Sequence, residues 1–530
     1  MRAGVTVGSG GITYSWDYTA DVVILGTGLS GLSTAITAYD AGANVLVLEK
    51  MPQEYEGGNS KVSGNGFYTN TGVAQAAEYM KAMDMANYKL GYLDDSIIDA
   101  VSAGIQENES VVTQMGGEFT GIPDPEFPLL PGGPSAVIQV MVLNGVPQLG
   151  NGHLWQLYRD AVSSRNINIM YNTPATELIQ NGDTGEILGV TAVGSSGTVN
   201  IQANKAVVLA CGGFEFNQAM QVTYLPGFPI CGFGTPGDTG DGITMAQKVG
   251  ADLWHMNTTS GGSPGAIVVP DYPYPMAYLL GPAIGNNYIW VGKDGNRFAN
   301  ESLGFASHGW GVKEYGFQFY TDGGATGSFL RIPCWVVFDA TACKAGPFVP
   351  TIGSKLGAPT GKMGWFLWNS GYTWSSDNSA EIAKGWITKA DSIADLAAAI
   401  AADPDNLNPT GAPFMTAGAL QATVTTFNGF ATSGTDSAFG RPGSTMAPIQ
   451  TAPFYAVKVW PVVVNTNGGP RRNVKCQIVD PDSNPIPRLY GVGECGSFWG
   501  WMYQGGGNLA ECMWTGRVAG ANAAAETPWS

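Results

Sequence analysis

The sequence predicts an α/β fold organised around a nucleotide-binding strand–turn–helix unit, and three stretches carry this prediction. Residues 21–50 contain an apolar strand, a glycine-rich turn, a helical run and a second apolar strand. Residues 205–214 form another apolar strand that ends in two glycines, and residues 488–494 form a strand followed by a glycine turn and an acid. Short apolar runs bounded by glycine turns are typical of buried strands in such folds.

The first of these stretches has the order strand, tight turn, helix, strand and acid that a dinucleotide site requires. Gly26 makes the turn, Gly28 lets the backbone approach a pyrophosphate, and Gly31 lets the helix pack close to the sheet. The helix N-terminus offers free N–H groups and about half a positive charge to phosphates. Glu49 can accept hydrogen bonds from ribose hydroxyls. The alternative, in a chain with 75 Gly, is a glycine-rich turn without a ligand.

The composition excludes several classes of protein. The chain has 530 residues, enough for two domains or for one large domain with an insertion. Its net charge of −17 argues against a nucleic-acid partner, whose phosphates require clustered Lys and Arg. No apolar run approaches the roughly 20 residues of a membrane span. Residues 1–20 lack the apolar core of an export signal.

Cysteine and histidine usage indicates neither a disulfide framework nor a metal centre. The seven Cys are odd in number and include no C-x-x-C pair, so we expect no iron–sulfur cluster or c-type haem. The three His lie far apart in the sequence and have no metal-ligand spacing. We therefore expect cysteines that pack as small apolar residues, no bound metal, and a reducing, cytoplasmic setting.

Further glycine-rich stretches indicate more points of close backbone approach. Residues 56–67 follow soon after the acid of the first unit, and a long cofactor would contact them at Gly58, Ser60 and Ser63. Gly212-Gly213 lies at the carboxyl end of a strand, where a ligand contact is favoured over a plain turn. Near the C-terminus another glycine-rich turn begins a helix, and such a helix end favours a developing anion.

Residues 215–455 differ in character from the segments that flank them. Eight of the 15 Trp lie here, with many Pro and Gly, and helical patterns occur at residues 392–402 and 419–430. We interpret this region as an inserted domain that closes over the cofactor. Many of its Trp belong to the core, and some line a substrate cavity.

Taken together, these motifs resemble the flavoproteins grouped around fumarate reductase, succinate dehydrogenase and the 3-ketosteroid dehydrogenases. The resemblance implies a Rossmann-like, glutathione-reductase-type FAD-binding domain formed by residues 1–225 and 456–530, with an inserted α+β cap (substrate) domain at residues 226–455. The matching segments span nearly the whole chain: GTGLSGLSTA (26–35), GGNSKVSGNG (57–66), VVLACGGF (207–214), TGDGITMAQKVGA (239–251), DGNRFANES (294–302), TNGGPRRN (466–473), and LYGVGECGS, YQGGGNLAEC and GRVAG within 489–520.

The resemblance also implies non-covalent FAD. By this resemblance Glu49 holds the adenosine ribose, Ala175 lies near the adenine, Glu494 binds the ribityl or ribose side, and Asn508 and Leu509 cap the flavin C2=O. The residues implied to bind FAD are Gly26, Gly28, Leu29, Ser30, Gly31, Glu49, Lys50, Gly57, Gly58, Asn59, Ser60, Ser63, Gly64, Asn65, Gly66, Ala175, Cys211, Gly212, Gly213, Asp241, Gly493, Glu494, Gly507, Asn508 and Leu509.

The chemistry implied by the resemblance is hydrogen transfer across a C–C bond next to a carbonyl. Flavin N5 exchanges a hydride with one carbon, a side chain handles a proton at the neighbouring carbon, and a donor holds the carbonyl oxygen. Tyr503 matches a Tyr of the ketosteroid enzymes that introduce the 4-ene. Their second Tyr aligns with Phe305, which carries no proton, so His308, Tyr315 or Tyr320 would replace it. The catalytic candidates are Tyr503, His308 and Tyr315.

Three departures from the fumarate reductases argue against a dicarboxylate substrate. The Arg that clamps a substrate carboxylate in those enzymes is replaced here by Gln504. Their proton-donating Arg falls near Phe305, and their His falls near Val464 or Asn465. A dicarboxylate would therefore lose its bidentate cation, its proton donor and a His. The 1-ene ketosteroid dehydrogenase sequence G-x-Y-P-G-P-G is also absent.

The sequence therefore predicts an FAD-dependent oxidoreductase acting on CH–CH groups, with a 3-ketosteroid or a similar apolar polycyclic enone as substrate. Its partners would be that small apolar substrate and a separate electron donor or acceptor. One alternative is a reductase of another enone or enoate, of phenolic, isoflavonoid or urocanate-like type. Another is a flavin-binding protein without activity.

Several Arg are candidates for structural roles. We expect Arg297 to form a salt bridge with Glu301 and Arg517 to pack beside the last helix. Arg471 and Arg472 either hold the flavin phosphate region or lie exposed, and the sequence leaves both alternatives open.

Overall fold

The chain folds into two compact units. The first contains Met1–Met220, Gly234–Thr259 and Asn465–Ser530, and the second contains Gln221–Phe233 and Ser260–Val464. Residues 226–455, predicted to form a cap, thus fall mostly in the second unit, whereas residues 234–259 belong to the first. The computed structural model describes residues 5–8, 11–86, 93–123, 126–127, 129–133, 138–143, 152–271, 276–277, 284–303, 325–349, 372, 374–500 and 503–529.

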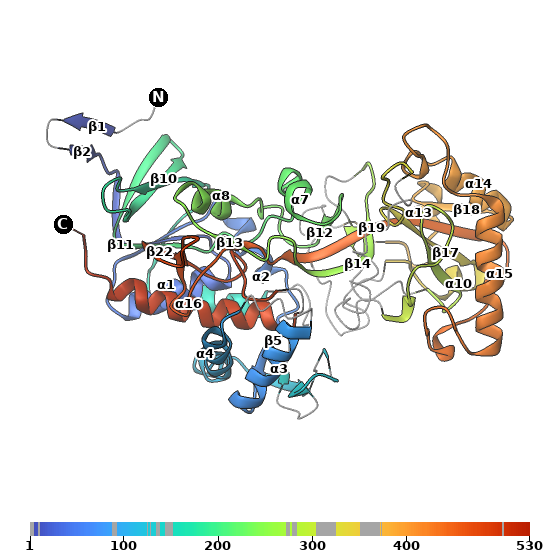
Figure 1. The fold of residues 1–530 in the computed structure, drawn as a ribbon, viewed down its shortest axis with the longest axis horizontal. Helices are drawn as coiled ribbons and strands as arrows, with labels where there is room; N and C mark the ends of the chain where they lie inside the picture. The colour runs from blue at the N-terminus through green and yellow to red at the C-terminus, as the bar shows by residue number, and fades with distance from the viewer. Residues whose placement is uncertain are drawn as a thin grey trace. The chain divides into compact units, whose positions relative to one another are not determined.

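A parallel sheet forms the centre of the first unit (Figure 1), and the prediction of an α/β fold is confirmed. Its parallel strands lie in the order β22-β11-β3-β4-β8, with β21 antiparallel at one edge and with β10 and β9 extending from β11 as an antiparallel meander. The bounds are β3 (Tyr18–Leu25), β4 (Val45–Leu48), β8 (Asn168–Met170), β9 (Ala175–Gln180), β10 (Ile187–Gly194), β11 (Gly197–Leu209), β21 (Gln477–Val479) and β22 (Pro485–Gly491).

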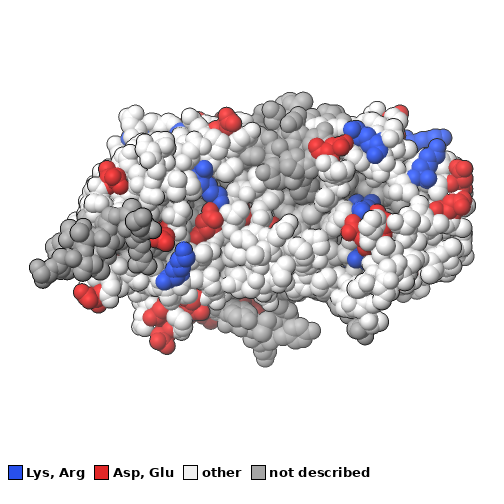
Figure 2. Space-filling view, turned by 90° about the horizontal axis from the view of Figure 1, so that it is seen from above, with Lys and Arg blue, Asp and Glu red and all other residues white. Residues whose placement is uncertain are grey.

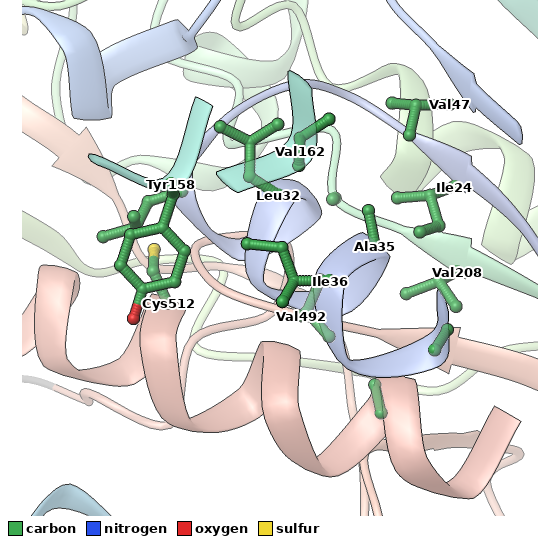
Figure 3. Close-up of a cluster of buried hydrophobic side chains, with 14 of the residues drawn as sticks. Ile24, Leu32, Ala35, Ile36, Val47, Tyr158, Val162, Val208, Val492 and Cys512 are labelled. Carbon is green, nitrogen blue, oxygen red and sulfur yellow. The ribbon is translucent and has the colours of Figure 1, made fainter. Parts of the chain in front are cut away.

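Helix α1 (Leu29–Asp40) packs its apolar side chains onto this sheet. Figure 3 shows Leu32, Ala35 and Ile36 of this helix in one cluster with Ile24 and Val47 of the strands. Because β4 is buried along its whole length, it consists of apolar residues only. Each fully buried aliphatic side chain stabilises the fold by about 1.5–3 kcal/mol relative to an exposed one.

Helix α16 (Gly507–Ala525) joins the C-terminal segment to α1 through small residues. A Cβ added at Gly516 would lie 2.5 Å from Ser33 Cβ, and one added at Gly520 would lie 2.7 Å from Thr34 O. The Ser33 hydroxyl donates to Met513 O at 2.9 Å. The two helices can therefore approach each other closely only because their facing positions carry glycine and other small residues.

The remaining elements of the first unit surround this core. The small sheet β5-β7-β6 pairs antiparallel throughout, and β13 pairs with β20. Trp529, next to the last residue of the sequence, lies against Trp16 with the ring planes tilted by 55° and the ring centroids 6.3 Å apart. The other bounds are β1 (Val5–Gly8), β2 (Gly11–Tyr14), α2 (Gly58–Lys61), β5 (Phe67–Asn70), α3 (Val73–Ala86), α4 (Asp95–Gln106), α5 (Asn108–Gln114), β6 (Phe119–Pro123), β7 (Ile138–Leu143), α6 (His153–Ser164), α8 (Asp241–Lys248), β13 (Leu253–Trp254) and β20 (Gly469–Pro470).

The second unit is built around the long strand β19 (Phe454–Thr466), which pairs antiparallel with β17 and β18. Helices α14 and α15 contribute to its apolar core. The predicted salt bridge of Arg297 to Glu301 is present at 2.7 Å, and Asp436 also pairs with Arg297 at 2.9 Å. The other bounds are α7 (Gln218–Tyr224), β12 (Cys231–Gly232), β14 (Thr259–Ile267), β15 (Met276–Ala277), β16 (Tyr288–Val291), β17 (Cys334–Asp339), α10 (Ala340–Ala345), α13 (Ser379–Ala383), β18 (Ile387–Ala390), α14 (Ile393–Ala401) and α15 (Ala417–Ser433).

The surface is sparsely charged. On the face shown in Figure 2, Lys and Arg are scattered among Asp and Glu and form no broad basic patch. This agrees with a chain in which only 13% of residues are charged. Among the described residues, no helix is both long enough and apolar enough to span a membrane.

Replacing Gly516 by Ala should destabilise the first unit, because the new Cβ would meet Ser33 Cβ at 2.5 Å and Ser30 O at 2.7 Å. We expect the free energy of unfolding to fall by about 1–3 kcal/mol, the usual cost of overpacking. Gly429→Ala is the matched control, since Gly429 lies inside α15 with no described atom within 4 Å of an added Cβ. That control should be neutral or stabilise by up to about 1 kcal/mol. Calorimetry that gives both variants the same Tm would contradict the close packing of α1 and α16.

Candidate cofactor site

A cavity opens in the first unit at the carboxyl ends of β3, β4 and β11. In α/β sheets this is where ligands bind. The predicted FAD-binding residues that line it are Gly26, Gly28, Ser30, Glu49, Lys50, Gly58, Asn59, Ser60, Ala175, Cys211, Gly212, Asp241 and Glu494. The predicted residues that are not part of its lining are Leu29, Gly31, Gly57, Ser63, Gly64, Asn65, Gly66, Gly213, Gly493, Gly507, Asn508 and Leu509.

Two of the three glycines at the start of α1 have no room for a side chain. A Cβ at Gly26 would lie 2.3 Å from Ala210 O, and one at Gly31 would lie 2.1 Å from Gly26 O. Gly28 differs, because its added Cβ would meet nothing closer than Ser60 Oγ at 3.9 Å. Gly28 has no side chain that could cap the helix, and the Ser60 hydroxyl accepts from the Leu29 N–H at 3.1 Å. Gly28, Ser30 and Ser60 line the cavity, so the N-terminus of α1 borders it, as a pyrophosphate site requires.

Glu49 fixes this turn and retains capacity for a ligand. Its Oε2 accepts from the backbone N–H of Thr27 at 3.0 Å and from the Thr27 hydroxyl. Its Oε1 accepts from the Met51 N–H at 2.8 Å. A carboxylate oxygen can accept two hydrogen bonds, so Oε1 can take one more from a ribose hydroxyl. The proposed ribose contact of Glu49 stays a prediction, and the structure leaves an acceptor for it.

Lys50 and Asp241 form a pair on the cavity wall. The Lys50 ammonium donates to Asp241 Oδ2 at 2.7 Å and to the Thr239 hydroxyl at 2.8 Å. Asp241 is the first residue of α8, where the helix dipole also favours its negative charge. Because the two side chains bind each other, the pair adds little net charge to this side of the cavity.

Three carboxyl groups meet beside the cavity: Glu215, Asp238 and Glu494. One oxygen from each lies within 4.8 Å of the others. The Asn59 amide bridges two of them, donating to Glu215 Oε1 at 2.8 Å and to Glu494 Oε2 at 3.1 Å. Burial, reinforced by the neighbouring carboxylates, raises the pKa of Asp238 and of Glu494, and burial also raises the pKa of Glu215.

The N-terminus of α16 holds the predicted catalytic Tyr503. Its hydroxyl accepts from the backbone N–H of Asn508 at 3.1 Å, and its ring lies edge-on to Trp499. Burial raises the pKa of Tyr503 above its ordinary value, so the hydroxyl stays protonated at neutral pH. The Asn508 side chain in turn donates to Asn465 Oδ1 at 2.5 Å. This end of the helix thus presents neutral polar groups.

Gln504, at the position that the resemblance assigns to a carboxylate-clamping Arg, is fully buried. Its carbonyl oxygen accepts from the Tyr79 hydroxyl at 2.9 Å and from the Glu126 N–H at 3.2 Å. Its amide donates to Gly505 O at 3.3 Å. The side chain is therefore neutral and bound to the protein itself.

The sequence left two alternatives for Arg472, a contact with the flavin phosphate region or an exposed position, and the structure shows neither. Arg472 is buried and pairs with Glu511 of α16. It also donates to Gly491 O at 3.0 Å and to Gly493 O at 3.1 Å, and so fixes the turn that carries Glu494. Glu511 accepts from the Ser497 hydroxyl at 2.6 Å, and burial raises its pKa to about 7. Sequence reasoning missed this contact because its partners are far apart along the chain.

Arg471 and Arg517 also form contacts within the protein. Arg471 pairs with Asp252 at 2.5 Å, so its guanidinium is not directed at a phosphate. Arg517 donates to Asn108 Oδ1 at 2.7 Å and to Gly104 O at 2.9 Å, the packing role expected for it. All seven cysteines are free thiols.

Two of the three predicted catalytic residues, His308 and Tyr315, lie outside the described residues, as do Phe305 and Tyr320. Of the three predicted catalytic residues, only Tyr503 lies among the described residues. Conversely, the cavity is lined by residues that the sequence analysis did not select: Leu25, Thr27, Leu48, Met51, Thr173, Pro174, Ala210, Thr235, Gly237, Asp238, Met245 and Cys512. Asp238 could have been found from its place three residues before Asp241, in the same glycine-rich stretch.

The fold and the cavity define a dinucleotide-binding flavoprotein. Residues 21–509 match the family described as FAD binding domain. The chain belongs to this family of FAD-dependent oxidoreductases that act on carbon–carbon bonds, and FAD is its cofactor. The residues present fit that group, since the N-terminus of α1 borders the cavity, Glu49 retains an acceptor, and Asp238 and Glu494 direct further acceptors at the cavity.

Relatives extend over nearly the whole chain. A digoxin reductase of Eggerthella lenta is 30% identical over 97% of this chain and 88% of that protein. A urocanate reductase of the same organism is 28% identical over 95% of this chain and 74% of that protein. The structure of a 3-ketosteroid Δ1-dehydrogenase from Sterolibacterium denitrificans covers 96% of this chain and 99% of its own, with a TM-score of 0.76 and 22% identity. Other relatives are named as fumarate reductases and 3-oxosteroid 1-dehydrogenases, so the predicted family is confirmed.

Gly28→Val should abolish FAD retention while leaving the fold intact. A Cβ at Gly28 has space in the protein itself, and the valine side chain would occupy the place where a pyrophosphate approaches α1. We expect the FAD affinity to fall by about 100-fold or more, equivalent to about 3 kcal/mol. Gly182→Val, in an exposed turn with no described atom within 4 Å of an added Cβ, is the control and should retain FAD. Equal flavin content in the two purified variants would refute this site.

Proposed function

We propose that this enzyme transfers hydrogen across a C–C bond adjacent to a carbonyl, on a 3-ketosteroid or a similar apolar polycyclic enone. The observation that carries the proposal is the state of Gln504, which is neutral, buried and bound to Tyr79 and to the backbone of Glu126. A dicarboxylate substrate needs a bidentate cation at this position. A ketone needs only a neutral hydrogen-bond donor, which agrees with the uncharged groups at the N-terminus of α16.

Two relatives favour reduction as the direction. The digoxin reductase, 30% identical to this chain, acts by its name on digoxin, and the urocanate reductase is also named as a reductase. Other relatives are named as 3-oxosteroid 1-dehydrogenases, which favour a steroid as substrate. We therefore propose that the physiological reaction is the reduction of a carbonyl-conjugated C=C bond.

Tyr503 is our candidate for the residue that meets the substrate carbonyl or supplies its proton. When bound, FAD supplies the hydride chemistry of the reaction. The Tyr503 hydroxyl accepts a hydrogen bond from the Asn508 N–H, so its own proton is directed to another acceptor. The raised pKa keeps that proton in place at neutral pH. The partial positive charge of the helix N-terminus favours the oxyanion that develops on a carbonyl.

A second candidate substrate is an unsaturated carboxylic acid of the urocanate type. The observation in its favour is the 28% identity to a urocanate reductase over 95% of this chain. Such a monoacid would need one cation, which Gln504 does not provide. We therefore rank it below an apolar enone.

We also propose the finer architecture implied by the resemblance. The glycine turn at Gly26, followed by α1 and the parallel strands, supports a Rossmann-like FAD-binding domain of the glutathione-reductase type. The second unit would then be the cap (substrate) domain. We propose that a separate donor supplies the electrons.

Tyr503→Phe should lower turnover by about 10²–10⁴-fold, the usual contribution of a positioned proton donor. FAD content should not change, because Tyr503 is not part of the cavity lining. Tyr39→Phe is the control, since Tyr39 is exposed on α1, and it should keep full activity. The turnover of both variants should be measured in steady-state assays with the enone on which the unmodified enzyme is most active. An unchanged turnover for Tyr503→Phe would rule out a catalytic role for Tyr503.

The substrate class is tested by mixing dithionite-reduced holoenzyme anaerobically with single compounds. A steroid that carries a C=C bond conjugated to a ketone should restore the oxidised flavin spectrum. Fumarate should leave it reduced, because Gln504 cannot clamp a second carboxylate. Rapid reoxidation by fumarate would overturn the proposal, and reoxidation by urocanate alone would replace it with the second candidate.

A further inference from the structure

Arg472 and Glu511 form a buried ion pair beside the part of the chain that leads to Tyr503. Arg472 follows β20 and Glu511 lies in the second turn of α16, and their side chains are only 3% and 1% exposed. A buried ion pair adds little net stability, because the loss of water around two charges offsets most of their attraction. The pair is therefore expected to have a role besides stability, and its further hydrogen bonds indicate which.

Arg472 fixes the turn that follows β22. Its guanidinium donates to Gly491 O at 3.0 Å and to Gly493 O at 3.1 Å. The N–H of Gly493 donates to the Thr515 hydroxyl at 3.0 Å, and that hydroxyl donates to Glu511 O at 2.6 Å. This turn is therefore bound to α16 both through the ion pair and through Thr515.

Glu511 fixes the chain on the other side of the ion pair. Its Oε2 accepts from the Ser497 hydroxyl at 2.6 Å, and its Oε1 accepts from the Phe498 N–H at 3.0 Å. The Ser497 hydroxyl oxygen in turn accepts from the Trp499 N–H at 3.1 Å. An ionised carboxylate suits this set, because both of its oxygens act only as acceptors. One carboxylate thus orients three consecutive residues.

Ser497 is also bound at its backbone. Its N–H donates to Asn467 O at 3.0 Å, and its carbonyl oxygen lies 2.8 Å from His255 Nδ1. The Asn467 side chain donates to Gly500 O at 3.2 Å. Every polar atom of Ser497 therefore has a partner in the protein, and these hydrogen bonds hold residues 497–500 in one conformation.

The ring of Trp499 connects these residues to Tyr503. The two rings are edge-on, with centroids 5.5 Å apart and planes at 78°. The indole also lies on the first turn of α16, where a Cβ at Gly507 would be 2.5 Å from Trp499 Cζ2. The Tyr503 hydroxyl accepts from the N–H of Asn508, in the same turn. The contacts that begin at Glu511 thus end at the ring of Tyr503.

We propose that Glu511, held by Arg472, is a positioning residue for Tyr503. It fixes Ser497, and through Trp499 it sets the orientation of the Tyr503 ring. The inference rests on the proposed function, in which Tyr503 meets the substrate carbonyl or supplies its proton. Glu511 and Arg472 are buried, so they act on the reaction through Tyr503 and not on the substrate.

Ser497→Ala is the main test, because it removes only the hydroxyl that links Glu511 to the Trp499 N–H. We expect kcat to fall by about 10- to 100-fold, the effect of misplacing a catalytic group by about 1 Å. KM and FAD content should stay within about twofold of the unmodified values. Ser33→Ala is the matched control, since Ser33 is also a buried serine that donates to α16, to Met513 O at 2.9 Å. It should keep full turnover.

Glu511→Gln is the second variant, since it removes the charge and keeps one acceptor. We expect kcat to fall by about 10- to 100-fold here too. Its Tm should also fall, because Arg472 loses its buried counterion. In a Tyr503→Phe background, Ser497→Ala should lower turnover no further, because residues that act through one group are not additive. An equal loss in both backgrounds would overturn the proposal.

A second measurement follows Tyr503 without using activity. In holoenzyme labelled with fluorotyrosine, the fluorine NMR resonance that is missing from Tyr503→Phe reports the surroundings of Tyr503. Ser497→Ala and Glu511→Gln should shift or broaden that resonance, and Ser33→Ala should not. An unchanged resonance, or an unchanged kcat of Ser497→Ala while Tyr503→Phe is impaired, would overturn the positioning role. A shifted resonance together with full turnover of Tyr503→Phe would support the positioning of Tyr503 and refute instead its proposed function.

Discussion

The packing of α1 against β3 and β11 on one side and against α16 on the other is the contact on which the cofactor cavity depends. A Cβ at Gly31 would lie 2.1 Å from Gly26 O, so the helix backbone is in contact with the Gly26 turn. A Cβ at Gly516 would lie 2.5 Å from Ser33 Cβ, so α16 is in contact with α1. Because α16 follows the segment that carries Glu494, this contact brings two distant parts of the sequence to one place. A Cβ at Gly493 would lie only 2.6 Å from Ser30 Oγ, which shows how closely the two glycine turns meet.

Patterns confined to a short stretch were predictable from the sequence. The spacing of Gly26, Gly28 and Gly31 predicted the turn, the helix and the position of the cavity. Gly26 and Gly31 have no room for a side chain, whereas Gly28 borders the cavity itself. Glu49 was predicted from an equally local pattern, its position at the end of the next strand. The strand pattern likewise predicted β11 and β22, although it could not predict that both pair parallel with the first strands.

Contacts between distant segments could not be predicted in the same way. Arg472 and Glu511 form a buried pair that no spacing rule describes, and the sequence analysis left Arg472 between two roles that it does not have. Asp238 was missed although it lies three residues before Asp241, because the glycine-rich stretch alone does not show which of its acids faces the cavity. Its significance appears only when Glu215 and Glu494 are seen beside it. The sequence placed Gln504 at the position of the carboxylate-clamping Arg of the fumarate reductases, but its hydrogen bonds with Tyr79 and Glu126 could not be predicted.

The site combines features that cost stability with features that secure a ligand. Buried acceptors such as Asp238 Oδ2 and Glu494 Oε1 destabilise the protein until a donor meets them. A cofactor that supplies hydroxyl groups would offset this cost, so part of its binding energy would come from completing the hydrogen bonds of the protein. The most direct measurement is a crystal structure of the holoenzyme. Our account predicts the FAD pyrophosphate at the N-terminus of α1, beside Gly28, inside the cavity at the carboxyl ends of β3, β4 and β11. A cofactor bound elsewhere would contradict it.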